Sequence, residues 1–245
     1  MTIKNIFKIH PFYFFAAFVS VITGHFKDFL LFSLIIVVHE CGHVFLALIF
    51  KWNVYEIILL PFGALTVFNE KINRPLFEEF LILIFGPIFQ IVFTFAFYNE
   101  NIFNLSTSIL FFNLLPVIPL DGSKVVNILL NRFLSFKKSH LITIYISFLT
   151  IFFVMIKAHF NLILMLIFIF ILFKIIDEIK NHNNIFKKFL LERYIYDFNF
   201  KKIKFIKSLN LDNMKRDYRH IFYNGKEYVT ERRIIKKMFD FPSKT

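Results

Sequence analysis

Long apolar runs separated by short polar stretches dominate the first 176 residues of the chain. A helix of about 17 to 25 predominantly apolar residues is long enough to cross a bilayer. The pattern predicts an all-α polytopic membrane protein with about six transmembrane helices. The six runs cover residues 6–24, 29–50, 76–98, 102–119, 140–156 and 160–176.

The first run is the weakest of the six. Lys8, His10 and Pro11 leave it about a dozen uninterrupted apolar residues, a length that also suits the core of a signal peptide. No small-residue cleavage site follows the run. We therefore expect it to be a membrane anchor.

A further apolar stretch, residues 54–68, has a different pattern. Pro61 and Gly63 interrupt it, and β-branched and aromatic residues are frequent within it. These features favour a strand pair or a re-entrant hairpin over a membrane helix. We expect a short β-hairpin between the second and third long runs.

Composition and charge agree with a membrane setting. Of the residues, 57% are hydrophobic, and 39 of 245 are Phe. Lys and Arg collect in short cytoplasmic loops, and nine basic residues lie in alternate polar segments against only Lys27 and Lys157 in the others. We therefore expect a multi-pass integral membrane protein with both termini in the cytoplasm. The nine are Lys4, Lys8, Lys51, Lys71, Arg74, Lys124, Arg132, Lys137 and Lys138.

From residue 177 onward the chain becomes polar and basic, with 17 Lys and Arg against nine Asp and Glu. We expect a membrane domain over residues 1–180 and a basic cytoplasmic tail over 181–245. Residues 219–223 and 226–230 flank Asn224-Gly225, which predicts a hairpin, and a short helix is expected over 231–239. The tail is thus expected to be a small α+β region. Its charge is dispersed among Phe and Tyr, so no direct nucleic-acid binding is expected.

One polar cluster interrupts the second apolar run: His39-Glu40-Cys41-Gly42-His43 is an HExxH motif. Residues four apart share one face of a helix, so both imidazoles can reach one metal ion with Glu40 at its edge. This arrangement is typical of zinc hydrolases. The alternative is a set of polar side chains that satisfy a neighbouring membrane helix.

Cys41 is the single cysteine of the chain, which excludes an intrachain disulfide. It points about 100° per residue away from its neighbours on the helix, so we expect it to pack against a helix and not to bind metal. Gly42 likewise indicates close packing against another helix.

The two imidazoles are one ligand too few for a catalytic zinc site, because such sites usually have three protein ligands. Asp121 is the only acidic residue between Asn101 and Asp177, and it follows Pro116 and Pro119. The prolines must break a helix, and unwound backbone at membrane depth is tolerated where it lines a cavity. We expect Asp121 to turn inward as a ligand. The alternative is a turn that leaves the membrane, with Asp121 capping the next helix.

Together, the HExxH motif and the later sequence N-x-x-P-x-x-P-L-D-G, residues 113–122, resemble the site-2 intramembrane metalloproteases. Shorter matches spread over residues 5–197 are similar to the branch of that family that acts in sporulation. These matches are His10-Pro11-Phe12, Thr23-Gly24-His25, Leu60-Pro61-Phe62-Gly63, Asn73-Arg74-Pro75-Leu76, Gly86-Pro87 and Phe189-Leu190-Leu191-Glu192-Arg193-Tyr194.

The resemblance implies a zinc metalloendopeptidase with one Zn²⁺ per chain. His39, His43 and Asp121 would be the metal ligands, and Glu40 the general base. The resemblance also implies that Asn113 orients the substrate or the developing oxyanion. A helix–helix hydrogen bond is the alternative role for Asn113.

The substrate implied by the resemblance is the membrane-associated pro-form of a late sporulation sigma factor. It would be cut near the cytoplasmic face of a bacterial cell membrane or the membrane surrounding a forespore. Inhibitory membrane proteins would be further partners. Such proteases carry a C-terminal CBS regulatory domain, and residues 181–245 look like a shortened, divergent version of one. A free strand edge within residues 54–68 could hold an unwound substrate, with a purely structural hairpin as the alternative.

Two functions of other classes compete with proteolysis. A ZIP-like zinc transporter also has a His-Glu-x-x-His pattern in a membrane helix, but it needs more His and Glu ligands on a neighbouring span. Apart from Glu78, Glu79 and His140 at the ends of their runs, the other runs offer only the isolated His10, and Asp121 follows the fourth run. An inactive membrane scaffold would follow if Asp121 did not reach the metal.

Overall fold

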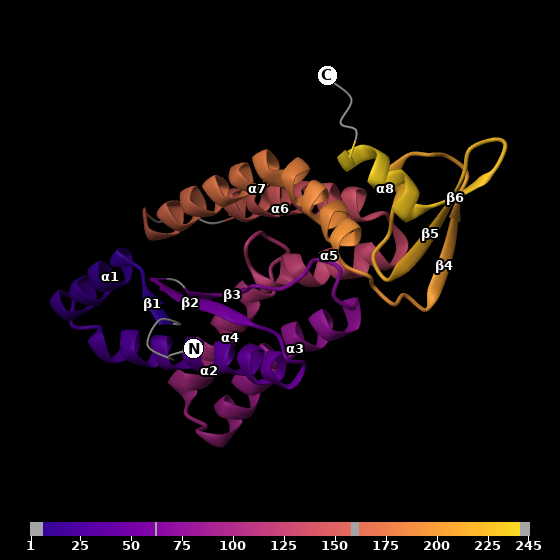
Figure 1. The fold of residues 1–245 in the computed structure, drawn as a ribbon. Helices are drawn as coiled ribbons and strands as arrows, with labels where there is room; N and C mark the ends of the chain where they lie inside the picture. The colour runs from indigo at the N-terminus through magenta and orange to yellow at the C-terminus, as the bar shows by residue number, and fades with distance from the viewer. Residues whose placement is uncertain (1–6, 62, 158–161, 241–245) are drawn as a thin grey trace. The chain divides into compact units, whose positions relative to one another are not determined.

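The computed structural model describes residues 7–61, 63–157 and 162–240 of the chain (Figure 1). The described chain is mostly helical and contains two three-stranded sheets. Its contacts group into two compact units, residues 1–70 with 77–115 and residues 71–76 with 116–245. Each unit has its own sheet and its own buried apolar residues.

The sheet of the first unit contains β1 (Phe7–Ile9), β2 (Val54–Leu60) and β3 (Gly63–Phe68), in that order. The central strand β2 is parallel to β1 and antiparallel to β3. The hairpin expected over residues 54–68 is therefore confirmed. Strand β1 was expected to be part of a membrane span. It is extended because Pro11, with its fixed φ, starts the following helix and leaves the residues before it outside.

Four helices complete the first unit, and α2 lies at the centre of their packing. Ile35 and Ile36 of α2 form a buried cluster with Ile109 of α4. At the other end of α2, Ala47 forms a second cluster with Ile82 of α3. The helices are α1 (Pro11–Ile22), α2 (Phe26–Ile49), α3 (Leu76–Ala96) and α4 (Glu100–Asn113).

Three helices in the described part of the chain are long and apolar enough to cross a membrane: Phe26–Ile49, Leu76–Ala96 and Phe136–Ile156. They correspond to the second, third and fifth expected runs. The run expected over 102–119 is instead the 14-residue helix α4 followed by an irregular segment, because Pro116 and Pro119 cannot continue a helix. Residues 6, 160 and 161 of the expected runs lie outside the described residues.

The second unit combines three helices with a small C-terminal sheet. The helices are α5 (Asp121–Phe133), α6 (Phe136–Lys157) and α7 (Leu162–Ile195). The remaining elements are β4 (Lys202–Ile206), the 3₁₀ turn η2 (Leu211–Asn213), β5 (Tyr218–Tyr223), β6 (Tyr228–Thr230) and α8 (Glu231–Asp240). The antiparallel pair β5–β6 is the expected hairpin, and α8 is the expected short helix. Strand β4, which is parallel to β5, was not expected.

The end of α7 holds the second unit together. Phe189 and Leu190 are fully buried in a cluster with residues of the C-terminal sheet and α8. The next residue but one, Glu192, accepts hydrogen bonds from the backbone N–H groups of Ile72 at 3.0 Å and Asn73 at 3.1 Å. The side-chain nitrogen of Asn73 donates to the same carboxylate at 3.0 Å. The segment before α3 is thereby fixed to the end of α7.

Candidate metal centre

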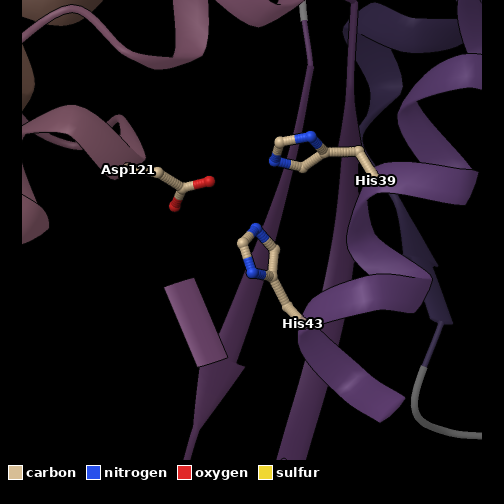
Figure 2. A group of neighbouring side chains, drawn as sticks. All are labelled: His39, His43 and Asp121. Carbon is tan, nitrogen blue, oxygen red and sulfur yellow. The ribbon is translucent and has the colours of Figure 1, made fainter. Parts of the chain in front are cut away.

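His39 and His43 lie one turn apart on α2, and Figure 2 shows both imidazoles projecting from this helix. Their side chains are almost completely buried, with residue exposures of 1% and 4%. The ring centroids are 4.8 Å apart. The shared helix face expected from the HExxH spacing is therefore present, inside a candidate membrane span.

The tautomer of His39 is fixed by Gln90 on α3. Nδ1 of His39 lies 2.7 Å from Oε1 of the Gln90 side chain. An amide oxygen has no proton to donate, so Nδ1 of His39 must carry the proton. Nε2 of His39 then presents a lone pair, which is the form of imidazole that binds a metal.

The tautomer of His43 is fixed in the same way by the backbone of α3. Nδ1 of His43 lies 2.8 Å from the carbonyl oxygen of Ile82, which can only accept. Both histidines therefore carry the proton on Nδ1 and the lone pair on Nε2. A backbone carbonyl is one of the usual outer partners of a metal-binding histidine.

Two glycines allow α3 to come this close to α2. A Cβ on Gly42 would come within 2.9 Å of the Gly86 Cα and nearer still to the carbonyl oxygen of Phe85. A Cβ on Gly86 would overlap the ring of His43. The close packing expected at Gly42 is thus confirmed, and Gly86 provides the space that the His43 ring occupies.

Glu40 is buried beside the two histidines and is held by the sheet. The hydroxyl of Thr66, on β3, donates a hydrogen bond to Oε2 of Glu40. Both side chains are buried. This bond engages Oε2 and not Oε1, so it orients the carboxylate while one oxygen stays available for proton transfer.

Asp121 is the first residue of α5, and Leu120 occupies the N-cap position. It follows the irregular segment after α4, as expected from Pro116 and Pro119. The Asp121 side chain is 13% exposed, and its Oδ1 accepts from Nζ of Lys124 at 3.1 Å. One potential ligand atom from each of His39, His43 and Asp121 lies within 4.8 Å of the others (Figure 2).

Two imidazoles and a carboxylate fit a catalytic zinc ion. This donor set matches the three protein ligands that zinc hydrolases use. The hydrogen bonds at both Nδ1 atoms leave the correct nitrogen of each ring for ligation. Within the described residues, one group of three or more His, Cys, Asp or Glu side chains is arranged to hold a metal ion, and it consists of His39, His43 and Asp121.

Asn113 and Cys41 have less defined surroundings. Asn113 is the last residue of α4 and is half-buried, and its side chain makes no hydrogen bond to any described residue. The alternative role as a helix–helix hydrogen bond is therefore absent from the described chain. Cys41 is exposed on α2. The expectation that it packs against a helix is wrong, because Gly42, the next residue, makes that contact.

Sequence reasoning missed two residues that support the centre, Gln90 and Thr66. A signal for Gln90 was present, since Gln90 and Thr94 are polar residues four apart in an otherwise apolar run. Such a pair marks one face of a helix that meets other polar groups. No comparable signal marked Thr66, because its contact with Glu40 depends on the path of the hairpin.

Comparisons with known proteins agree with this centre. The model of "Peptidase family M50" matches residues 28–103, which include the HExxH motif and Gln90. The "Site-2 Protease from Methanocaldococcus jannaschii" has a similar fold, with a TM-score of 0.55 at 24% identity over 73% of this chain and 93% of that one.

A similarity in sequence extends further than the family model does. "Stage IV sporulation protein FB" of Bacillus subtilis is 36% identical over 202 residues, which cover 76% of this chain and 70% of that protein. Identity at this level over most of both chains decides the family. The chain is a member of peptidase family M50, the site-2 proteases.

Proposed function

We propose that this protein is an intramembrane zinc metalloprotease in which His39, His43 and Asp121 bind one Zn²⁺ and Glu40 is the general base. The observation that carries the proposal is the buried pair His39 and His43 within a candidate membrane span, with the Nδ1 atom of each ring hydrogen-bonded to α3. Family membership supports the same chemistry.

When bound, zinc would lower the pKa of water to about 7 and polarise the scissile carbonyl. Among the residues of the chain, Glu40 acts first: it accepts the proton of the attacking water and returns it to the leaving amine. Thr66 keeps Oε2 engaged, so the proton is carried on Oε1. Burial of Glu40 keeps bulk water away from the carboxylate.

We assign Asn113 a role in orienting the substrate or the developing oxyanion. Its position at the end of α4, half-buried and without a hydrogen bond to a described residue, supports this role. A side-chain amide offers both a donor and an acceptor to an incoming peptide. Replacing Asn113 with Asp should therefore reduce cleavage and leave zinc content unchanged.

The proposed substrate is a membrane-associated protein, cut near the cytoplasmic face. The similarity to a stage IV sporulation protein supports the pro-form of a late sporulation sigma factor as that substrate. Inhibitory membrane proteins would then regulate the enzyme, which would act in a bacterial cell membrane or the membrane surrounding a forespore.

Strand β3 is the proposed docking edge for the unwound substrate. It lies at one side of the sheet, and β2 is the central strand. An extended peptide paired with β3 would gain the backbone hydrogen bonds it loses on leaving a helix. A Pro replacing Ala64 in β3 tests this role, because Leu59, its partner in β2, turns its backbone groups toward β1 and the N–H of Ala64 therefore lies on the outer side of β3. Unchanged cleavage by Ala64→Pro would exclude docking on β3.

For the membrane arrangement we propose six spans with both termini in the cytoplasm. The three candidate spans form its core, and the charge asymmetry of the loops supplies the orientation. A reporter fused after Thr245 should be cytoplasmic. Activity of the reporter on the opposite, non-cytoplasmic side of the membrane would exclude this topology.

Residues 181–245 are proposed to form a regulatory tail attached to the protease domain, residues 1–180. A pocket of about 380 Å³ lies between the segment after α7, β5 and the start of α8. Its presence supports a binding role for the tail, in keeping with a shortened, divergent CBS-like region. The pocket is lined by Arg193, Tyr196, Asp197, Phe198, Asn199, Phe200, Arg219, Thr230, Glu231 and Arg232.

The test measures zinc content and cleavage in parallel for the wild type, Glu40→Gln and Asp121→Ala, each co-expressed with a sporulation pro-sigma substrate. Glu40→Gln should retain zinc and lose cleavage, whereas Asp121→Ala should lose both. If the wild type cleaves nothing and Glu40→Gln changes zinc uptake by cells, the protein is a transporter. If the wild type neither cleaves nor binds zinc, the scaffold function is correct.

A further inference from the structure

We propose that Gln90 is a positioning residue of the metal centre, which sets the tautomer of His39 through a closed network of hydrogen bonds. The inference rests on the proposed role of His39 as a zinc ligand. All members of the network lie on α2, α3 and α4 of the first unit.

The orientation of the Gln90 amide follows from its neighbours. Nε2 of Gln90 lies 2.8 Å from the backbone carbonyl oxygen of Ser106 and 3.1 Å from Oγ of the same residue. A carbonyl oxygen only accepts, so the NH₂ group must face Ser106 and Oε1 must face His39. A flipped amide would place Oε1 against the Ser106 carbonyl oxygen, where neither atom has a proton to donate.

Thr94 closes the network on its remaining side. Its hydroxyl donates to the backbone carbonyl of Gln90 at 2.8 Å and lies 2.6 Å from Oγ of Ser106. Because the Thr94 proton points to the Gln90 carbonyl, Ser106 must donate to Thr94 and accept from Gln90. Each proton in the network therefore has one defined position.

Burial makes this arrangement costly to break. Gln90 is completely buried, and Ser106 and Thr94 are 4% and 5% exposed. An unpaired polar group at such a position has no water to replace the lost partner. A direct consequence is that His39 is held with its proton on Nδ1 before any metal arrives, so Nε2 is ready for ligation.

An amide has a specific advantage at this position over the carboxylate that often supports a metal-binding histidine. It accepts from His39 and donates to Ser106 at the same time, whereas an ionised carboxylate only accepts. It also adds no buried charge to a centre that already contains Glu40. The network is thus fully satisfied and neutral.

The experiment uses the full chain in detergent and compares wild type, Gln90→Met, Gln90→Glu and the control Ile91→Met. Zinc affinity is measured by competition with a chelator, and the Co²⁺-loaded protein is examined by absorption spectroscopy. Gln90→Met lacks the acceptor for His39 and should weaken zinc binding by about 10- to 100-fold, with an altered Co²⁺ spectrum. Ile91, the next residue on α3, is 40% exposed, so its replacement by Met should change neither result.

Gln90→Glu separates positioning from packing, because it keeps the oxygen that faces His39 and loses the donor to Ser106. It should bind zinc more tightly than Gln90→Met even where the metal-free protein is less stable to heat. Equal affinities for wild type and Gln90→Met would overturn the proposal, as would equal losses in Gln90→Met and Gln90→Glu.

If Gln90→Met does not fold, Gln90→Asn takes its place, since the shorter side chain withdraws the oxygen from His39 with little loss of volume. Wild-type zinc affinity in Gln90→Asn would also overturn the proposal. Failure of the proposed function has a different signature: the wild-type protein itself would bind no zinc.

Discussion

Gly86 lies against the imidazole of His43, so close that an added Cβ would come within 2.9 Å of Cδ2 and nearer still to Cε1 and Nε2. The His43 ring cannot move aside freely, because its Nδ1 is bonded to the carbonyl of Ile82 at 2.8 Å. The smallest possible side chain at residue 86 therefore competes with the metal-facing nitrogen of His43.

Gly86→Ala should reduce zinc content and cleavage together. Placing a methyl group in a filled site costs about 1–3 kcal/mol, and here the ring of His43 is the group that must shift. Metal analysis and cleavage of the proposed substrate provide the readouts. Gly63→Ala is the matched control for zinc content, since a Cβ there meets nothing within 4 Å. Normal zinc content in Gly86→Ala would show that the His43 ring adapts.

Thr66→Val should lower the rate of cleavage and leave zinc content unchanged. The substitution keeps the shape of the side chain but removes the hydroxyl that donates to Glu40. A hydrogen bond to a charged group contributes about 1.5–3 kcal/mol, so we expect a loss of about 10- to 100-fold in kcat. Thr66→Ser retains the hydroxyl and should recover most of the rate. Equal rates in Thr66→Val and wild type would mean that Glu40 is oriented by other groups.

The C-terminal sheet should lose stability in mild acid because of His220. Its Nε2 accepts from the backbone N–H of Lys215 at 3.0 Å, and its Nδ1 donates to Glu231 at 2.9 Å. Burial, opposed by the bond to Glu231 and aided by Arg193, lowers the pKa of His220 below its usual 6.5. The unfolded chain then binds more protons than the folded one as the pH falls through 6.5, and stability decreases.

Hydrogen exchange of β5 at pH 7.5 and pH 5.5 measures this loss of stability locally. A local measurement is necessary because burial also lowers the pKa of His182, whose titration would contribute to any measurement of global stability. His220→Asn should be less stable at pH 7.5 and show a smaller change between the two pH values. His25→Asn, at a side chain 73% exposed, is the control. An equally large change with pH in His220→Asn would assign the titration to another group.

Glu192→Gln should loosen the segment before α3. The carboxylate accepts three hydrogen bonds from Ile72 and Asn73, and an amide would turn its NH₂ group toward at least one of these donors. A buried donor left without its partner costs about 1–3 kcal/mol. Faster hydrogen exchange at residues 72 and 73 is the expected result. Glu227→Gln removes only an exposed ion pair of 3.9 Å and should leave this exchange unchanged.

The parts of the centre that could be predicted from the sequence are those determined by local rules. Spacing along one helix put His39 and His43 on a single face, and Pro116 with Pro119 predicted the break before Asp121. The hairpins at residues 54–68 and 219–230 followed from turn residues and strand-forming side chains.

The parts that could not be predicted depend on contacts between distant segments. Strands β1 and β4 are parallel to their partners, and parallel strands cannot be joined by a tight turn, so no turn residues predict either pairing. Thr66 meets Glu40 across 26 residues, and Gln90 meets His39 across 51. The exposure of Cys41 was misjudged because a single helix position can be assigned to a face only when the neighbouring helices are known.

Ile82, Gly86 and Gln90 are spaced by four residues on α3, opposite His43 and His39 on α2. A helix advances 1.5 Å and turns 100° per residue. Inserting one residue in α3 between Ile82 and Gln90 would therefore displace the partner of one histidine relative to the partner of the other. A substitution at Ile82, Gly86 or Gln90 affects the partner of one imidazole, but an insertion between Ile82 and Gln90 changes the positions of the two partners relative to each other. The length of this eight-residue interval therefore determines whether both rings face one ion.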